Sequence, residues 1–215
     1  MEEFWSITRK ALNFVFLLAS PFMLYFMFYA KEGILFLSGS AYASSIVPMQ
    51  IIMPTLLLIG ITNILGIQIL VPLGKEKIVL YSEIAGAIVD VIINAILIPR
   101  YVSAGAAIGT LVAEFVVLVV QYYALRKEVN IFFRKIHYFR ISIALVLASF
   151  SSLWLKAFKC GSFLTLILSA VLFFGVYGFF LLATKEPLIL EIYRQIIDWL
   201  SKKLQSFNFF AKNKK

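Results

Sequence analysis

The chain has 215 residues, of which 62% are hydrophobic and only 14% are charged, and its formal net charge is +9. Soluble domains contain about 45–50% apolar and about 25% charged residues, so this composition excludes an ordinary soluble domain and predicts an integral membrane protein. A single cysteine and a single histidine exclude an internal disulfide and a metal cluster built from these residue types.

Six apolar segments follow one another along the chain, and each is long enough for one membrane crossing, which takes about 20 residues. We expect them at residues 11–30, 46–72, 78–98, 102–124, 141–158 and 162–184. The first exceeds a signal-peptide core of roughly 7–15 residues, so it is interpreted as a helix that stays in the membrane. The second contains Pro54, Gly60 and Gly66, and a tilted or kinked helix is expected there. The predicted fold is all-α and polytopic.

Lysine and arginine are distributed unequally between the two sides of the membrane. The amino terminus, the 73–77 turn, the 125–140 loop and the tail after residue 184 hold 16 of the 20 cations. Cytoplasmic loops carry an excess of Lys and Arg, so both termini are expected in the cytoplasm. The same rule accounts for the cations and aromatics of the 126–140 loop as an interfacial segment, and no nucleic-acid partner is expected.

The second and third segments are joined by a short basic turn made of Gly74, Lys75, Glu76 and Lys77. Glycine ends a helix easily, and lysines resist passage through the membrane. We therefore predict a tight cytoplasmic hairpin at these four residues.

The chain is expected to divide into a six-helix transmembrane lobe at 1–185 and a cytoplasmic region at 186–215. In the second region, Ile189, Ile192 and Ile196 share a helical face opposite Arg194 and Asp198. This pattern predicts an amphipathic helix with a basic tail, either lying on the inner leaflet or packed against the cytoplasmic loops of the bundle.

Several ionisable and amide residues fall inside the apolar segments. In the third segment Glu83, Asp90 and Asn94 occur at i, i+7 and i+11, which is one helix face, and the fourth segment carries Glu114 near mid-depth. An Asp at the centre of a membrane helix costs about 2.5–3.5 kcal/mol on insertion scales, so such residues usually face a bundle interior or a wet cavity. We expect Asp90 and Glu114 to share a cavity on an ion or substrate path. The alternative is that these groups only form interhelical hydrogen bonds, each worth on the order of 1 kcal/mol.

Two further amides and two glycines complete the candidate residues. Asn63 and Gln68 are five residues apart, about 140° around a helix, so we expect one to line the cavity and the other to bond a neighbouring helix. Gly105 and Gly109 form a GxxxG pattern, which is typical of closely packed membrane helices.

No enzyme is predicted, because the loops opposite the cytoplasm are short and hold no combination of nucleophile, base and metal ligands. The sequence therefore predicts no catalytic residues, no metal and no cofactor. His137 and Cys160 fall in loops without partner residues, and neither is given a role.

The stretch NILGIQILVPLGKEK at 63–77, and the turn ILIPRY followed by GAAIGTLVAE at 96–114, carry a family resemblance. Over residues 33–126 the chain resembles the carboxyl-terminal half of a bacterial polysaccharide-biosynthesis (O-antigen) flippase, within the multidrug/oligosaccharidyl-lipid/polysaccharide exporter superfamily. The positions that match the family's pattern are Asn63, Gln68, Gly74, Lys75, Glu76, Lys77, Asn94, Pro99, Gly105 and Glu114. Asp90 departs from it, because the family leads us to expect Asn at that position.

The resemblance implies a function in the bacterial inner membrane. Members of that family move undecaprenyl-pyrophosphate-linked oligosaccharide repeat units across the membrane for O-antigen (lipopolysaccharide), capsule or exopolysaccharide synthesis, through a cavity between two lobes. The chain would then be one lobe of a two-lobed transporter, a half or truncated one, whose partners are the lipid-linked oligosaccharide, membrane lipid, and an amino-terminal lobe or a second copy of itself. Two alternatives stay open, a non-transporting membrane scaffold for polysaccharide assembly and a drug or cation antiporter lobe of the same superfamily.

Overall fold

The computed structural model describes residues 2–133, 138–157, 161–191, 194–195 and 199. His137, Cys160 and most of the expected amphipathic tail lie outside the described residues. The described elements are, in chain order, α1 (Glu2–Phe28), α2 (Ala30–Leu37), η1 (Ser40–Ser45), α3 (Ile46–Ile52), α4 (Thr55–Asn63), η2 (Ile64–Leu70), α5 (Glu76–Tyr101), α6 (Ser103–Phe133), α7 (Tyr138–Leu153), η3 (Trp154–Ala157) and α8 (Ser162–Ala183).

Five described helices are long and apolar enough to cross a membrane, at Glu3–Phe28, Glu76–Tyr101, Ser103–Glu128, Tyr138–Ala157 and Ser162–Ala183. A sixth crossing is possible if the pair Ser40–Ile52 and Thr55–Leu70 forms one span, whose two parts are bent by 42°. The prediction of an all-α polytopic protein is confirmed. The break comes at Met53 and Pro54, within the segment where a kink was expected from its proline and glycines.

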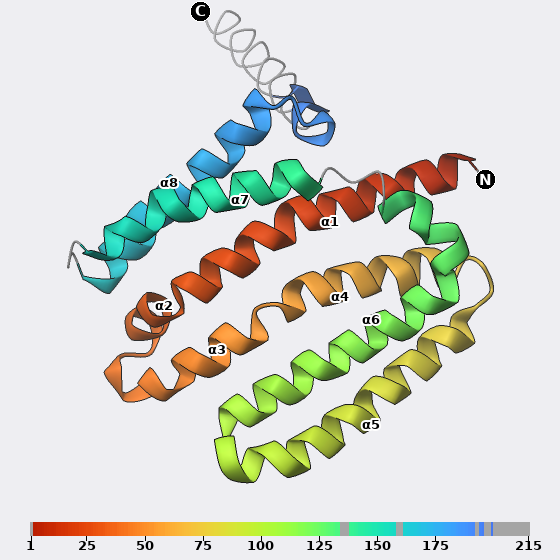
Figure 1. Cartoon of the computed structure of the whole chain (residues 1–215), viewed down its shortest axis with the longest axis horizontal. Helices are drawn as coiled ribbons and strands as arrows, with labels where there is room; N and C mark the ends of the chain where they lie inside the picture. Colours follow the sequence, from red (N-terminus) through yellow and green to blue (C-terminus); the bar gives the residue numbers. More distant parts are fainter. Residues whose placement is uncertain (1, 134–137, 158–160, 192–193, 196–198, 200–215) are drawn as a thin grey trace, which may run out of the picture.

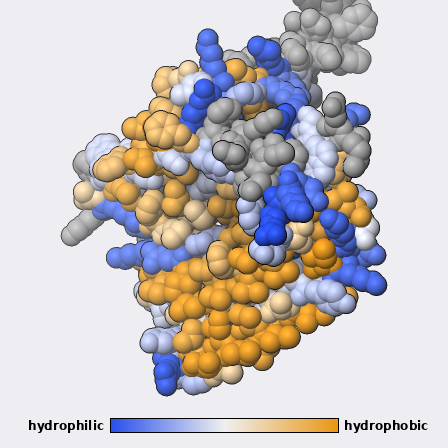
Figure 2. Space-filling model, turned by 45° about the vertical axis from the view of Figure 1, so that its right-hand side comes forward, coloured by the Kyte–Doolittle hydropathy of each residue, from blue (hydrophilic) through white to orange (hydrophobic). Residues whose placement is uncertain are grey.

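The helices lie side by side in a row (Figure 1). Helix α5 packs on α6, α6 packs on α3 and α4, α4 packs on α1, and α7 packs on α8 at the other edge. Helix α5 is therefore an edge helix, and its large apolar side chains, such as Leu80, Ile84, Ile88 and Val91, stay exposed. A broad hydrophobic surface covers one face of the molecule, with hydrophilic side chains mainly at its margins (Figure 2).

Helix α6 corrects one expected boundary. A loop was expected from residue 125, but α6 continues to Phe133. The segment LRKEVNIFF contains neither glycine nor proline, and Leu125 is fully buried, so nothing in it ends the helix. Helix α1 likewise begins at Glu2, about two and a half turns before the expected start of the first span.

Ion pairs occur near both ends of the helix axes. Among the described residues, each pair joins groups at the same end. One pair, between Lys156 and Glu32 at 3.7 Å, joins segments that the charge count places opposite the cytoplasm. The others join segments that it places in the cytoplasm, namely Lys10 with Glu191 (3.1 Å), Lys75 with Glu128 (3.6 Å) and Arg140 with Glu186 (3.7 Å).

The contact between α1 and α8 contains most of the buried aromatic side chains. Pro21 lies inside α1 and has no N–H to donate to the carbonyl of Leu17, four residues earlier. The buried Tyr177 of α8 donates its hydroxyl to that carbonyl oxygen at 2.9 Å. Tyr25 of α1 similarly donates to the carbonyl oxygen of Leu166 at 2.8 Å. Tyrosine hydroxyls thus pair with backbone groups inside an apolar core.

Candidate functional site

The candidate residues gather along the seam between α5 and α6, where glycines bring the two helices close together. A Cβ atom on Gly86 would lie 2.6 Å from a methyl carbon of Val117, and one on Gly105 would lie 2.6 Å from the carbonyl group of Leu97. Only glycine fits such close approaches without a shift of the neighbouring helix. Gly105 and Gly109 both lie in this contact, as expected for a GxxxG pattern.

Asp90 and Asn94 direct oxygen atoms at Gly109 of α6. A Cβ atom on Gly109 would lie 3.0 Å from Oδ1 of Asp90 and 2.2 Å from Oδ1 of Asn94. Both oxygen atoms are buried, and neither accepts a hydrogen bond from the described part of the chain. Buried polar atoms in proteins are nearly always hydrogen-bonded, so two neighbouring acceptors without a hydrogen-bond donor are unusual.

The two glutamates of the seam lie near each other. Glu114 of α6 is half-buried, Glu83 of α5 is exposed, and their charges are close enough to interact. The expectation that Asp90 and Glu114 share a cavity stays a prediction. Glu83 lies seven residues, or about two turns, nearer the basic end of α5 than Asp90 does.

Gln121 is a residue of the seam that sequence reasoning left without a role. Its side chain is 1% exposed, and its Nε2 donates to Oγ of Ser82 on α5 at 3.0 Å. A Cβ atom on Gly66 of η2 would lie 3.2 Å from the same nitrogen. Gln121 therefore lies where α5, α6 and η2 meet. The sequence signal was available, because Gln121 falls on the same helical face as Glu114.

Asn63 and Gln68 are not connected to the seam by any hydrogen bond within the described chain. Asn63 is exposed and donates to the carbonyl oxygen of Ile59, one turn earlier in α4, at 3.1 Å. Gln68 is exposed on η2, which has the wider π-helical hydrogen-bonding pattern. The expectation that one of them lines a cavity stays a prediction.

The basic hairpin has the local geometry that its sequence suggests. Gly74 has φ of +69°, which is the left-handed conformation that glycine adopts most easily. The N–H of Lys75 donates to the carbonyl oxygen of Leu70 at 2.9 Å, and α5 begins at Glu76. Lys77 is exposed beside it.

A second buried carboxylate was missed by sequence reasoning. Glu186 follows α8 and is fully buried, where it pairs with Arg140 of α7 and accepts from Nδ2 of Asn13 on α1 at 3.3 Å. Its position at the start of the expected tail gave no reason to assign it to the lobe. It connects α1 and α7 to the segment that follows α8.

Among the described residues, no group of three His, Cys, Asp or Glu side chains could hold a metal ion. No protein-family model, curated protein or solved structure matches this chain. The flippase resemblance therefore stays a prediction.

Proposed function

We propose that this chain is one lobe of a membrane transporter that moves lipid-linked oligosaccharides, of the undecaprenyl-pyrophosphate type, across the bacterial inner membrane. The observation that carries the proposal is the polar seam, formed by Glu83, Asp90 and Asn94 on α5 and Glu114 on α6. Ionisable groups inside membrane helices are costly, and they usually mark a path for an ion or a polar substrate.

The depth of the seam suits a path across the membrane. At a rise of about 1.5 Å per residue, Asp90 lies about 21 Å from the start of α5 at Glu76, and Glu83 lies about 10 Å from it. Because α5 has 26 residues and is about 39 Å long, Asp90 is near its middle. A substrate that crosses the bilayer must pass this level.

The seam offers hydrogen-bond acceptors, which fits a sugar. Glu83 is exposed and Glu114 is half-buried, so their carboxylate oxygens can accept hydrogen bonds, and the hydroxyl groups of an oligosaccharide are donors. A pyrophosphate group, in contrast, would be repelled by Glu83 and Glu114. The seam is therefore proposed to contact the sugar part of the substrate, while cations elsewhere in the assembly bind the pyrophosphate.

A second lobe is part of the proposal. Alternating access requires one bundle to move against another around a site at mid-depth, and this chain supplies one wall of such a site. The second lobe is either a separate amino-terminal lobe or a second copy of this chain.

The test replaces Asp90 by Asn and Glu114 by Gln together in a working assembly, and measures the export of repeat units in cells. Export is expected to be abolished, while membrane fractionation finds the protein at wild-type level. Glu3→Gln, at an exposed position near the start of α1, is the matched control and should leave export unchanged. Undiminished export by the double variant would contradict the assignment, as expected for a scaffold that does not transport.

A further inference from the structure

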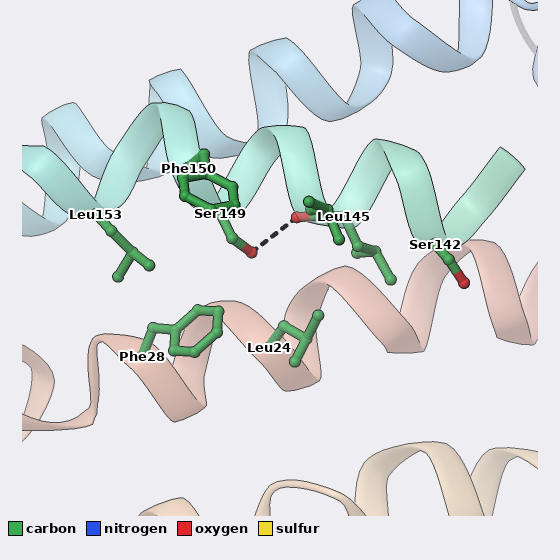
Figure 3. Close-up of a pocket in the computed structure, with 8 residues that line it drawn as sticks. Leu24, Phe28, Ser142, Leu145, Ser149, Phe150 and Leu153 are labelled. Atoms are coloured by element: carbon green, nitrogen blue, oxygen red, sulfur yellow. Dashed lines mark hydrogen bonds between the residues drawn. The ribbon is translucent and has the colours of Figure 1, made fainter. Parts of the chain in front are cut away.

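A groove of about 430 Å³ runs between α1 and α7, on the part of the lobe away from the α5–α6 seam (Figure 3). Leu24 and Phe28 of α1 form one wall, and α7 forms the other from Ser142 to Leu153. Figure 3 shows the side chain of Ser149 directed from α7 toward α1, and its hydroxyl donates to the carbonyl oxygen of Leu145 at 2.7 Å. The groove wall is thus apolar over most of its length.

The groove is continuous with the surface that α7 presents to lipid. Phe150 lines it and is 77% exposed, and Val146 lines it and is 53% exposed. Both lie inside Tyr138–Ala157, one of the candidate membrane spans. The groove is therefore open to the hydrocarbon of the bilayer along its side.

The length of the groove matches one lipid chain. From Ser142 to Leu153 the wall advances by 11 residues, which is about 16 Å along the helix, and one leaflet of the hydrocarbon core is about 15 Å thick. Beyond Ser142 the rings of Phe16 on α1 and Tyr138 on α7 pack against each other, with their centroids 5.3 Å apart. A lipid chain can enter the groove from the side, and the end near Leu153, away from this ring contact, is here called its open end.

A cation lies at the open end. Lys156 follows Leu153 by three residues on the same helical face, and its ammonium group donates to the carbonyl oxygen of Phe28, a residue of the opposite wall. It also pairs with Glu32 at 3.7 Å and lies over the ring of Tyr29. The side chain of Lys156 is 33% exposed, so a phosphate group at this level can approach its ammonium group beside Glu32.

We propose that this groove binds a phospholipid of the leaflet opposite the cytoplasm, with its phosphate at Lys156 and one acyl chain along α7 toward Ser142. The apolar wall, the length of one leaflet and the cation at the open end each correspond to a part of such a lipid. The site is separate from the α5–α6 seam, so it does not depend on the proposed transport function.

The first arm of the test fills the groove. The full chain in detergent is titrated with dioleoylphosphatidylglycerol, and the first bound lipid is measured by native mass spectrometry. Ser149→Phe fills the groove from α7 and Leu24→Trp fills it from α1, and each should weaken the first binding step about tenfold or more. Leu147→Phe changes an exposed position of α7 that does not line the groove, and this variant should bind as the wild type does.

The second arm tests the phosphate contact with dioleoylglycerol, which has the same chains and no phosphate. The wild type should prefer the phospholipid, and Lys156→Gln should abolish this preference, while Arg100→Gln, a cation at the end of α5, should keep it. Helix content and elution volume identify any variant that does not fold, and the two filling variants act from opposite walls. Unchanged lipid binding by the folded filling variants would overturn the proposal. Tighter binding of a polyprenyl phosphate than of phosphatidylglycerol would overturn the choice of occupant.

Discussion

At the scale of single residues, Tyr177 compensates for a hydrogen bond that Pro21 cannot make. Its hydroxyl donates to the carbonyl oxygen of Leu17, and Tyr177→Phe should therefore cost about 1 kcal/mol of unfolding free energy. Pro21→Ala supplies an N–H to the same carbonyl, so in that background Tyr177→Phe should cost clearly less. Reversible unfolding in mixed micelles measures the four proteins of this cycle. An equal cost in both backgrounds would show that Tyr177 does not act through Leu17.

Glu186, the buried partner of Arg140, is the second residue for which we predict a change in unfolding free energy. Breaking a buried ion pair from one side costs about 3–5 kcal/mol, but Arg140 is 42% exposed, so water stabilises part of its charge after the change. We expect Glu186→Ala to lower the unfolding free energy by about 2 kcal/mol. Glu191→Ala removes an exposed pair with Lys10 and should cost less than about 1 kcal/mol in the same unfolding assay. A smaller loss for Glu186→Ala than for Glu191→Ala would contradict the role assigned to burial.

At the scale of elements, the contact between α5 and α6 depends on glycine. A Cβ atom on Gly105 would meet the backbone carbonyl of Leu97 at 2.6 Å, and backbone cannot move aside as a side chain can. Gly105→Ala should therefore force the helices apart and cost about 1–3 kcal/mol. A Cβ atom on Gly178 of α8 would have no neighbouring atom within 4 Å, so Gly178→Ala should be neutral or stabilise the protein by up to about 1 kcal/mol. Equal unfolding free energies for the two variants would argue against close packing at the seam.

The elements also show which features a sequence can predict. Apolar length locates the membrane helices, and Pro54 with its neighbouring glycines indicates the bend between α3 and α4, because both signals are local. The contact of Gln121 with Ser82 and Gly66 depends on how three helices meet, which no local pattern contains. For the same reason the sequence does not predict that the packing of α5 on α6 brings Glu83 near Glu114.

At the scale of the whole molecule, the distribution of charge predicts how the chain is oriented across the membrane, which helix packing alone does not determine. The ion pairs at the basic end join α1, α6, α7 and the segments around the hairpin and after α8, so the ends that the charge count groups together are also close in space. The positive-inside rule predicts that this end lies in the cytoplasm. Because neither argument uses the proposed substrate, the orientation can be tested separately from transport.

Single cysteines in a Cys160→Ser background provide that test. Ala157→Cys is exposed at the end of η3, on the expected outer side, and Glu76→Cys is exposed at the start of α5, on the expected cytoplasmic side. A membrane-impermeant maleimide should label Ala157→Cys in intact cells and should label Glu76→Cys only after the membrane is permeabilised, because 16 of the 20 cations belong to segments that the sequence predicts on the side of Glu76. The reverse labelling pattern would show that the lobe has the opposite orientation in the membrane. The cation at Lys156 would then face the cytoplasm, and the groove between α1 and α7 would take its phospholipid from the inner leaflet.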